Sequence, residues 1–101
     1  MESSKQKLSE QQIHGLLIEL PEWALRDGKL VRDWTLPTFV DAVAFVNRVA
    51  KLAEEAQHHP DIDIRYNLVQ LALVSHDAGG ITERDAGMAR QLSAAFPTSA
   101  A

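Results

Sequence analysis

The sequence predicts an α+β domain in two layers, with a four-stranded antiparallel sheet and three helices packed on one face of it. Two capping-box patterns and one long amphipathic segment indicate the three helices. Two pairs of apolar segments, each pair joined by a short turn, indicate two hairpins. The predicted order is helix-strand-strand-helix-strand-strand-helix. Hairpins interleaved with helices favour an antiparallel sheet that buries one face under the helices.

The length of the chain predicts one domain. Its 101 residues are too few for two cores of ordinary size. We expect this domain at residues 8–95, after a polar, flexible N-terminus at 1–7 and before a C-terminal tail at 96–101.

The first helix and the first hairpin are indicated by local signals. Ser9 and Gln12 match a capping box, and Pro21 ends the helix that they open. The apolar residues between them recur at helical spacing: Ile13, Leu16, Leu17 and Leu20. Asp27-Gly28 then lies between two apolar segments, which is a strong hairpin signal.

A long helix is predicted from about Thr38 to Gln57, with Pro37 suited to its first turn. Two apolar ridges run along it: Phe39, Val43, Val46, Ala50 and Ala53, and then Ala42, Phe45, Val49, Leu52 and Ala56. This stripe is wider than a helix on one sheet needs to bury. We therefore expect the excess apolar surface to contact another subunit; the alternative is a well-covered core helix inside a monomer.

The second hairpin and the last helix follow. Apolar residues alternate with polar ones up to Tyr66, a continuous apolar strand runs from Leu68 to Val74, and Tyr66-Asn67 is the predicted turn between them. Thr82 and Asp85 match a second capping box, which opens the last helix.

Composition excludes several classes of function. The net charge of -4 and the absence of a Lys/Arg run disfavour nucleic-acid binding. Because there is no cysteine, disulfides, thiolate nucleophiles and Cys-ligated zinc are excluded. No apolar run approaches the roughly 20 residues of a membrane span, and the polar start does not resemble a signal peptide. We expect a cytoplasmic protein that does not bind a membrane.

Three of the four histidines, His58, His59 and His76, lie at junctions between predicted elements, whereas His14 is expected on the surface of the first helix. Imidazole has an unperturbed pKa of about 6.5, so three of them suit proton transfer. A metal site is one alternative, but adjacent side chains diverge by about 100° on a helix. The other is a structural role for His58 and His59 at the negative end of the helix dipole.

Carboxylates near the histidines are open to more than one interpretation. A continuing helix would place Glu54 beside His58 and Glu55 beside His59, either to orient the rings or as solvated ion pairs. The alternative for Asp85 is a purely structural role, as the third residue of its capping box. Two aromatic residues, Trp23 and Tyr66, are expected in the core rather than as stacking platforms.

The spacing of seven residues resembles a known signature: Glu54, His58, His59, Pro60, Tyr66, His76 and Asp85. The pterin-4a-carbinolamine dehydratase family carries this signature, and the resemblance extends from Leu8 to Leu92. It implies a four-stranded antiparallel sheet with helices on one face, assembled into homodimers or homotetramers. It also implies removal of water from 4a-hydroxytetrahydropterin to give quinonoid dihydropterin, which recycles the cofactor of aromatic amino acid hydroxylases.

The same resemblance implies roles for individual residues. His58 and His76 would be the catalytic acid/base pair, and His59 a third catalytic residue that mainly binds and orients the pterin. Substrate contacts are expected at His59, Pro60, Asp61, Ser75, His76 and Asp77, with the carboxylates of Glu54 and Asp85 behind the histidines. No metal and no cofactor is implied. An aromatic amino acid hydroxylase is the expected functional partner, and a binding or scaffold role on the same fold is the alternative function.

Overall fold

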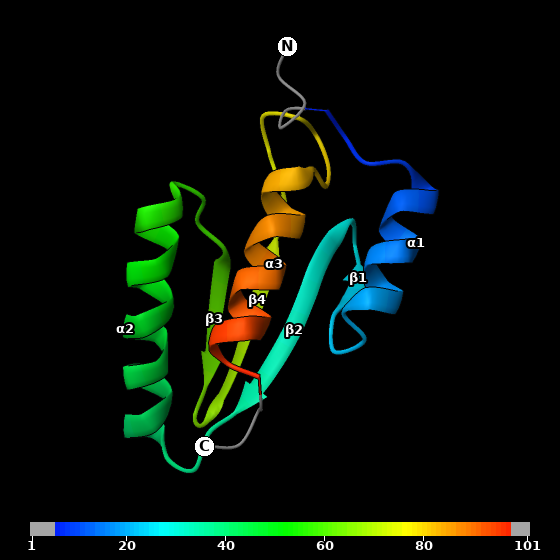
Figure 1. The fold of residues 1–101 in the computed structure, drawn as a ribbon. Helices are drawn as coiled ribbons and strands as arrows, with labels where there is room; N and C mark the ends of the chain where they lie inside the picture. Colours follow the sequence, from blue (N-terminus) through cyan, green and yellow to red (C-terminus); the bar gives the residue numbers. More distant parts are fainter. Residues whose placement is uncertain (1–5, 98–101) are drawn as a thin grey trace.

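The computed structural model describes residues 6–97 of the chain (Figure 1). The predicted loose N-terminus and tail therefore lie outside the described residues, apart from residues 6–7 and 96–97. The predicted order of elements is confirmed: α1 Glu10–Glu19, β1 Ala24–Arg26, β2 Lys29–Thr35, α2 Phe39–Ala56, β3 Asp61–Arg65, β4 Leu68–Leu73 and α3 Glu83–Ala95. Among the described helices, none combines the length and apolar character needed to cross a membrane.

The four strands form one antiparallel sheet in the order β1-β2-β4-β3. Each hairpin contributes one outer strand and one central strand, so the two hairpins meet where β2 pairs with β4. Ala72 shows the register, because it lies opposite Val31 on one side and Asp61 on the other. This topology places the start of β3 beside the end of β4. The predicted site residues that follow α2 therefore lie near those that follow β4.

The helices cover one face of the sheet, as predicted. Alternate residues of the two central strands point into the core: Leu30, Trp34, Val69, Leu71 and Leu73. They join Leu16 of α1, Phe45 of α2 and Met88 of α3 in one apolar cluster. The period-2 pattern of the strands thus meets the helical pattern of all three helices. Figure 1 shows α3 in front of the sheet, with α2 and α1 on either side of it.

Both predicted hairpin turns are confirmed, with different backbone geometry. Asp27 and Gly28 both have positive φ, 52° and 77°, as the two-residue turn favoured in hairpins requires. In the second turn Tyr66 has a φ of 55°. Its ring is 71% exposed, so the expectation that Tyr66 is a core aromatic is wrong. Trp23, by contrast, is buried and packs edge-on against Trp34, as expected of a core aromatic.

Both apolar ridges of α2 contribute to the core, but the first ridge does so only in part. Ala42, Phe45, Val49 and Ala53 are buried. Phe39 and Val40 are 49% and 74% exposed, and Ala50 is exposed as well. The helix begins after the cap Thr38 and ends before Gln57, whose left-handed conformation (φ 56°) turns the chain away from the helix axis.

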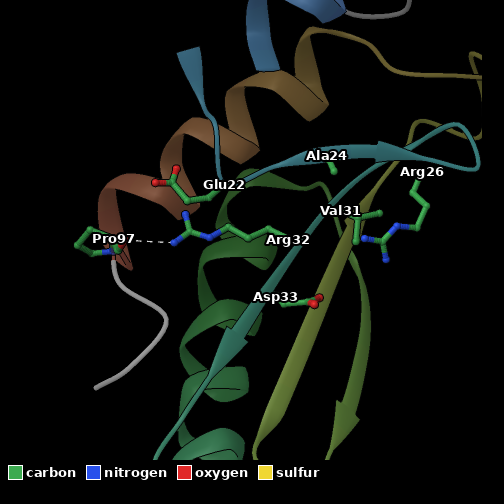
Figure 2. Close-up of a pocket in the computed structure, with 7 residues that line it drawn as sticks. All are labelled: Glu22, Ala24, Arg26, Val31, Arg32, Asp33 and Pro97. Carbon is green, nitrogen blue, oxygen red and sulfur yellow. Dashed lines mark hydrogen bonds between the residues drawn. The ribbon is translucent and has the colours of Figure 1, made fainter. Parts of the chain in front are cut away.

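Arg32 attaches the end of α3 to the sheet. Its guanidinium is buried, lies 4.3 Å from the centroid of the Trp34 ring, and donates to Ser93 Oγ and to the carbonyl of Pro97, each at 3.1 Å. Figure 2 shows this contact beside a hollow of about 440 Å³ that none of the predicted site residues lines. Burial lowers the pKa of Arg32, while the charge of Glu22 opposes that effect.

Candidate active site

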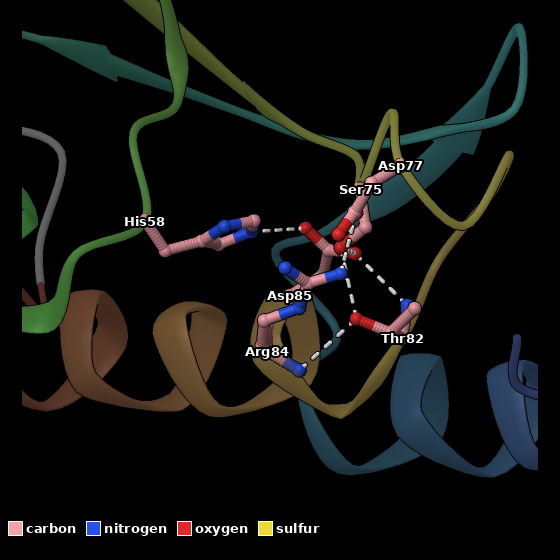
Figure 3. Close-up of polar contacts among 6 residues, drawn as sticks. All are labelled: His58, Ser75, Asp77, Thr82, Arg84 and Asp85. Carbon is pink, nitrogen blue, oxygen red and sulfur yellow. Dashed lines mark hydrogen bonds and ion pairs between the residues drawn. The ribbon is translucent and has the colours of Figure 1, made fainter. Parts of the chain in front are cut away.

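His58 is brought to Asp85 by the way α2 ends. The left-handed residue Gln57 reverses the chain, and the backbone N–H of His58 donates to the carbonyl of Ala53 at 3.2 Å. The His58 side chain, only 12% exposed, then reaches the N-terminus of α3, where Nε2 lies 2.6 Å from Oδ1 of the fully buried Asp85 (Figure 3). An imidazole paired with a buried carboxylate in this way is equipped for proton transfer.

Asp85 is held by the start of its own helix and by Ser75. Its Oδ2 accepts from the backbone N–H of Thr82 at 2.9 Å and from Ser75 Oγ at 2.8 Å. The Ser75 and Thr82 hydroxyls lie 2.8 Å apart, and Thr82 Oγ1 accepts from the backbone N–H of Arg84 at 3.2 Å. The predicted capping box is therefore confirmed, and its carboxylate also binds a histidine. A capping role and a place in the site coincide in one residue.

His76 lies on a closed turn that begins at Ser75. The Ser75 backbone N–H donates to the carbonyl of Gly80 at 3.0 Å, and its carbonyl accepts from Gly79 at 3.0 Å, where φ is 75°. Asp77 in the same turn accepts from Arg84 Nη2 at 2.6 Å. The exposed His76 thus directly follows a residue whose hydroxyl binds Asp85.

His59 lies apart from this network. Its Nε2 is 2.9 Å from Glu54 Oε1, and the two side chains are 61% and 73% exposed. The expectation that Glu54 would pair with His58, and Glu55 with His59, is wrong. It assumed a continuing helix, whereas the helix ends at Ala56 and Gln57 shifts both histidines in direction.

The structure does not bring every predicted substrate contact to His58. The carboxylate of Asp61 lies 3.0 Å from Lys29 Nζ, on the face of the sheet that the helices leave open. Pro60 is half-buried just before β3, and the Ser75 side chain is buried against Thr82 and Asp85. His58, Ser75, Asp77 and Asp85 are the predicted residues that meet around the start of α3.

A hollow of about 350 Å³ adjoins His58. It is lined by Ala56, His58, Glu83, Arg84, Gly87, Met88 and Gln91. The residues from α3 were missed as site residues by sequence reasoning. Their signal is present, since Arg84, Gly87, Met88 and Gln91 recur at helical spacing on one face of a helix whose start was predicted. The lining of the hollow combines apolar or small residues with polar and charged ones, as is usual for small-molecule sites.

Within residues 6–97, no group of three or more His, Cys, Asp or Glu side chains is arranged to hold a metal ion. The two adjacent histidines contact different carboxylates, Asp85 and Glu54. This divergence is what the geometry of adjacent residues predicts.

Comparisons with known proteins agree with this fold. The family model described as "Pterin 4 alpha carbinolamine dehydratase" matches residues 6–95. A protein of Thermomicrobium roseum named "Putative pterin-4-alpha-carbinolamine dehydratase" is 56% identical over 85% of this chain and 92% of its own length. A protein of Mycolicibacterium smegmatis with the same name is 51% identical over 84% of this chain and 90% of its own.

Two solved structures share the fold. A crystal structure titled as a transcriptional coactivator/pterin dehydratase from Brucella melitensis superposes with a TM-score of 0.81 and 33% identity, over 88% of this chain and 97% of that one. A pterin dehydratase-like RuBisCO assembly factor of the alpha-carboxysome superposes with a TM-score of 0.59 at 21% identity, over 75% of this chain and 88% of that one. The second likeness concerns the fold alone. With a family model matched over nearly its whole length and relatives more than 50% identical to it, the chain belongs to the pterin 4 alpha carbinolamine dehydratase family.

Proposed function

We propose that this protein removes water from 4a-hydroxytetrahydropterins by histidine acid/base catalysis. The observation that carries the proposal is the His58–Asp85 pair at 2.6 Å, which borders a hollow, in a chain of this family. His76 follows Ser75, whose hydroxyl binds the same carboxylate.

The reaction needs one acid and one base. The bond between C4a and its hydroxyl oxygen breaks, C4a forms a double bond to the neighbouring ring nitrogen, and that nitrogen loses its proton. The products are quinonoid dihydropterin and water. A protonated imidazole would assist departure of the hydroxyl group, and a neutral one would take the proton from nitrogen. In this proposal His58 and His76 share these tasks and His59 helps to hold the ring.

Substrate contacts are proposed on both sides of the site. The apolar or small residues that line the hollow, Ala56, Gly87 and Met88, suit the flat face of a heteroaromatic ring. The source of the substrate would be an aromatic amino acid hydroxylase, whose turnover leaves the carbinolamine.

The proposal is tested by stopped-flow absorbance with synthetic 4a-hydroxytetrahydropterin. We expect the wild-type protein to accelerate loss of the carbinolamine. His76→Ala should reduce kcat by about 10²–10⁴-fold, the usual contribution of one general acid or base, with little change in stability because His76 is exposed. His58→Ala should also lose activity, and it should unfold at a lower temperature because it leaves one oxygen of buried Asp85 without its partner.

His14→Ala is the matched control. His14 is exposed on α1 and far from α3's N-terminus in the sequence, so this variant should keep wild-type kcat. Wild-type protein that does no better than buffer, or His58 and His76 variants as active as His14→Ala, would refute the dehydratase proposal.

A second function, binding of another protein, is favoured by the exposed ridge of α2. Phe39 and Ala50 of this ridge are accessible, on a helix that buries Phe45 and Val49 in the core. The Brucella melitensis protein carries both roles in its title. A pull-down comparing wild type with Val43→Glu, and with Ala44→Glu as the control, would test this function. Identical partner sets for all three proteins would exclude recruitment through the ridge.

A further inference from the structure

The hydrogen atoms of the buried network around Asp85 can be assigned one by one. An ionised carboxylate only accepts, so the single hydroxyl hydrogen of Ser75 must point to Asp85 Oδ2, 2.8 Å away. Thr82 Oγ1 already accepts from the backbone N–H of Arg84, which leaves its own hydrogen free to donate. That hydrogen has Ser75 Oγ as its acceptor at 2.8 Å. The direction of the chain is therefore Thr82 to Ser75 to Asp85.

The accepting carboxylate decides which nitrogen of His58 carries hydrogen. Oδ2 of Asp85 accepts from Ser75 and from the backbone N–H of Thr82, and Oδ1 faces His58 Nε2. Since Asp85 has no hydrogen to give, Nε2 must donate to Oδ1. When His58 is neutral, its lone pair is then on Nδ1. Among the described residues, no hydrogen-bond partner of Nδ1 is present, and the ring borders the hollow of about 350 Å³.

We infer that His58 exchanges protons through Nδ1, and that Ser75 is a positioning residue that holds Asp85 so that Oδ1 faces Nε2. The assignment deepens the proposed function and rests on it only where it concerns turnover; the tautomer itself follows from the contacts. Ser75 is 2% exposed, and Asp85 and Thr82 are fully buried, so water does not compete for these hydrogens. Figure 3 shows the three side chains converging behind the imidazole.

Ser75 supports His58 through its side chain and His76 through its backbone. Its hydroxyl binds Asp85, while its backbone N–H and carbonyl close the turn that carries His76. Removal of the hydroxyl alone should therefore disturb His58 and leave the turn intact. A residue that only filled space at this position would show no such selectivity.

The first measurement is the nitrogen NMR spectrum of the histidine rings in ligand-free, ¹⁵N-labelled protein. In the wild type we expect neutral His58 to show a pyridine-like Nδ1 and a protonated Nε2. Ser75→Cys keeps the shape but offers only a weak donor, and Ser75→Ala removes the donor. Either change should let the Asp85 carboxylate turn so that Oδ1 no longer faces Nε2 in every molecule, and the ring should then show a mixture of tautomers. Ser75→Thr keeps the hydroxyl and should restore the single tautomer.

Ser93→Ala is the matched control for loss of a serine hydroxyl. Ser93 Oγ accepts from Trp23 Nε1 at 2.8 Å and from Arg32, at the other end of α3. This variant should lose stability without changing the His58 spectrum. If it altered the tautomer as Ser75→Ala does, the effect would be general loosening and the positioning role would be wrong.

Turnover supplies the second measurement. If the wild type is active, Ser75→Ala should lower kcat by about tenfold, a typical loss when a hydrogen bond that orients a functional imidazole is removed, and leave KM unchanged. Ser75→Thr should recover most of it. A pyridine-like Nε2 in wild-type His58, or a single unchanged tautomer in Ser75→Ala, would overturn the inference even for an active enzyme. An inactive wild type with the expected tautomer would overturn only the proposed function.

Discussion

At the scale of single residues, Asp85 combines two tasks that are usually separate. One of its carboxylate oxygens accepts from the backbone N–H of Thr82 in the capping box, and the other binds His58. A carboxylate at a helix N-terminus is favoured by the helix dipole and by the free backbone N–H groups there. The carboxylate is thus held by groups of α3 itself, independently of His58. The site uses a helix start as the fixed support for a proton-transfer group.

A second carboxylate, Glu19, predicts a pH effect on stability. Arg90 donates to both of its oxygens, at 2.8 and 3.0 Å, and so ties α3 to α1. The hydrogen bond from Arg90 lowers the pKa of Glu19 below its ordinary value of 4.5, against a smaller opposing effect of desolvation. A lowered pKa in the folded state means that the pair stabilises the fold above pH 4.5 and loses this effect as the pH falls through the folded value.

Glu19→Gln should therefore melt at a lower temperature than the wild type at neutral pH. The two melting temperatures should converge once the pH has fallen below the lowered pKa of Glu19 in the folded state, because the carboxyl group is then protonated in both states. Glu55→Gln is the control, because Glu55 is exposed and forms no ion pair with a described residue. A Glu19→Gln deficit that persisted unchanged in acid would contradict an electrostatic origin.

At the scale of secondary-structure elements, ends and turns decide where the site residues lie. Gln57 has a left-handed backbone at the end of α2, and this single conformation separates His58 from the helix and directs it to α3. The first hairpin depends on a different turn, in which Asp27 and Gly28 both have positive φ. Non-glycine residues adopt this conformation at a cost, so Gly28 is the residue that suits the second position.

Two glycine substitutions should have opposite effects on stability. Gly28→Ala should lower the free energy of unfolding by about 1 kcal/mol or more, because φ is 77° there although no atom would contact the new methyl group. Gly15→Ala, in the exposed middle of α1 with equal space, should raise it by about 0.5–1 kcal/mol. Urea titration measures both. Equal effects of the same sign would show that backbone conformation is not the cause.

At the scale of the whole molecule, the three helices cover one face of the sheet and leave part of α2 uncovered. The buried side of α2 contributes Phe45 and Val49 to the core, while Phe39 and Ala50 of the ridge remain accessible. Exposed apolar residues in line on a helix are typical of protein contacts. The expectation that this ridge joins subunits remains a prediction.

That prediction is tested by light scattering after size-exclusion chromatography. Wild-type protein should have the mass of two or four chains. Val43→Glu places a charge on the ridge at a half-buried position outside the core cluster, so it should dissociate the assembly without unfolding the chain. Ala44→Glu adds the same charge about 100° further around the helix and should leave the mass unchanged. A monomeric wild type would refute this arrangement.

Most of the fold could be predicted because its signals are local. The capping boxes of Ser9 and Thr82, the cap Thr38 and the Asp27-Gly28 turn involve groups within three residues of each other, so the sequence pattern contains the whole interaction. Tyr66 shows the limit of such patterns. It lies in the predicted turn, but alternation with Ile62 and Ile64 favoured a core position, whereas its side chain is exposed.

The sequence by itself determined the elements, the three histidines at their junctions and the family resemblance. Only the tertiary structure decided which groups these histidines meet. The partner of His58 is 27 residues away, and the Ser75 hydroxyl binds Asp85 across 10 residues. Glu54 looked like the partner of His58 from its helical spacing, but it binds His59. Local rules describe neighbours on one element, whereas hydrogen bonds between elements depend on where the packed core places their ends.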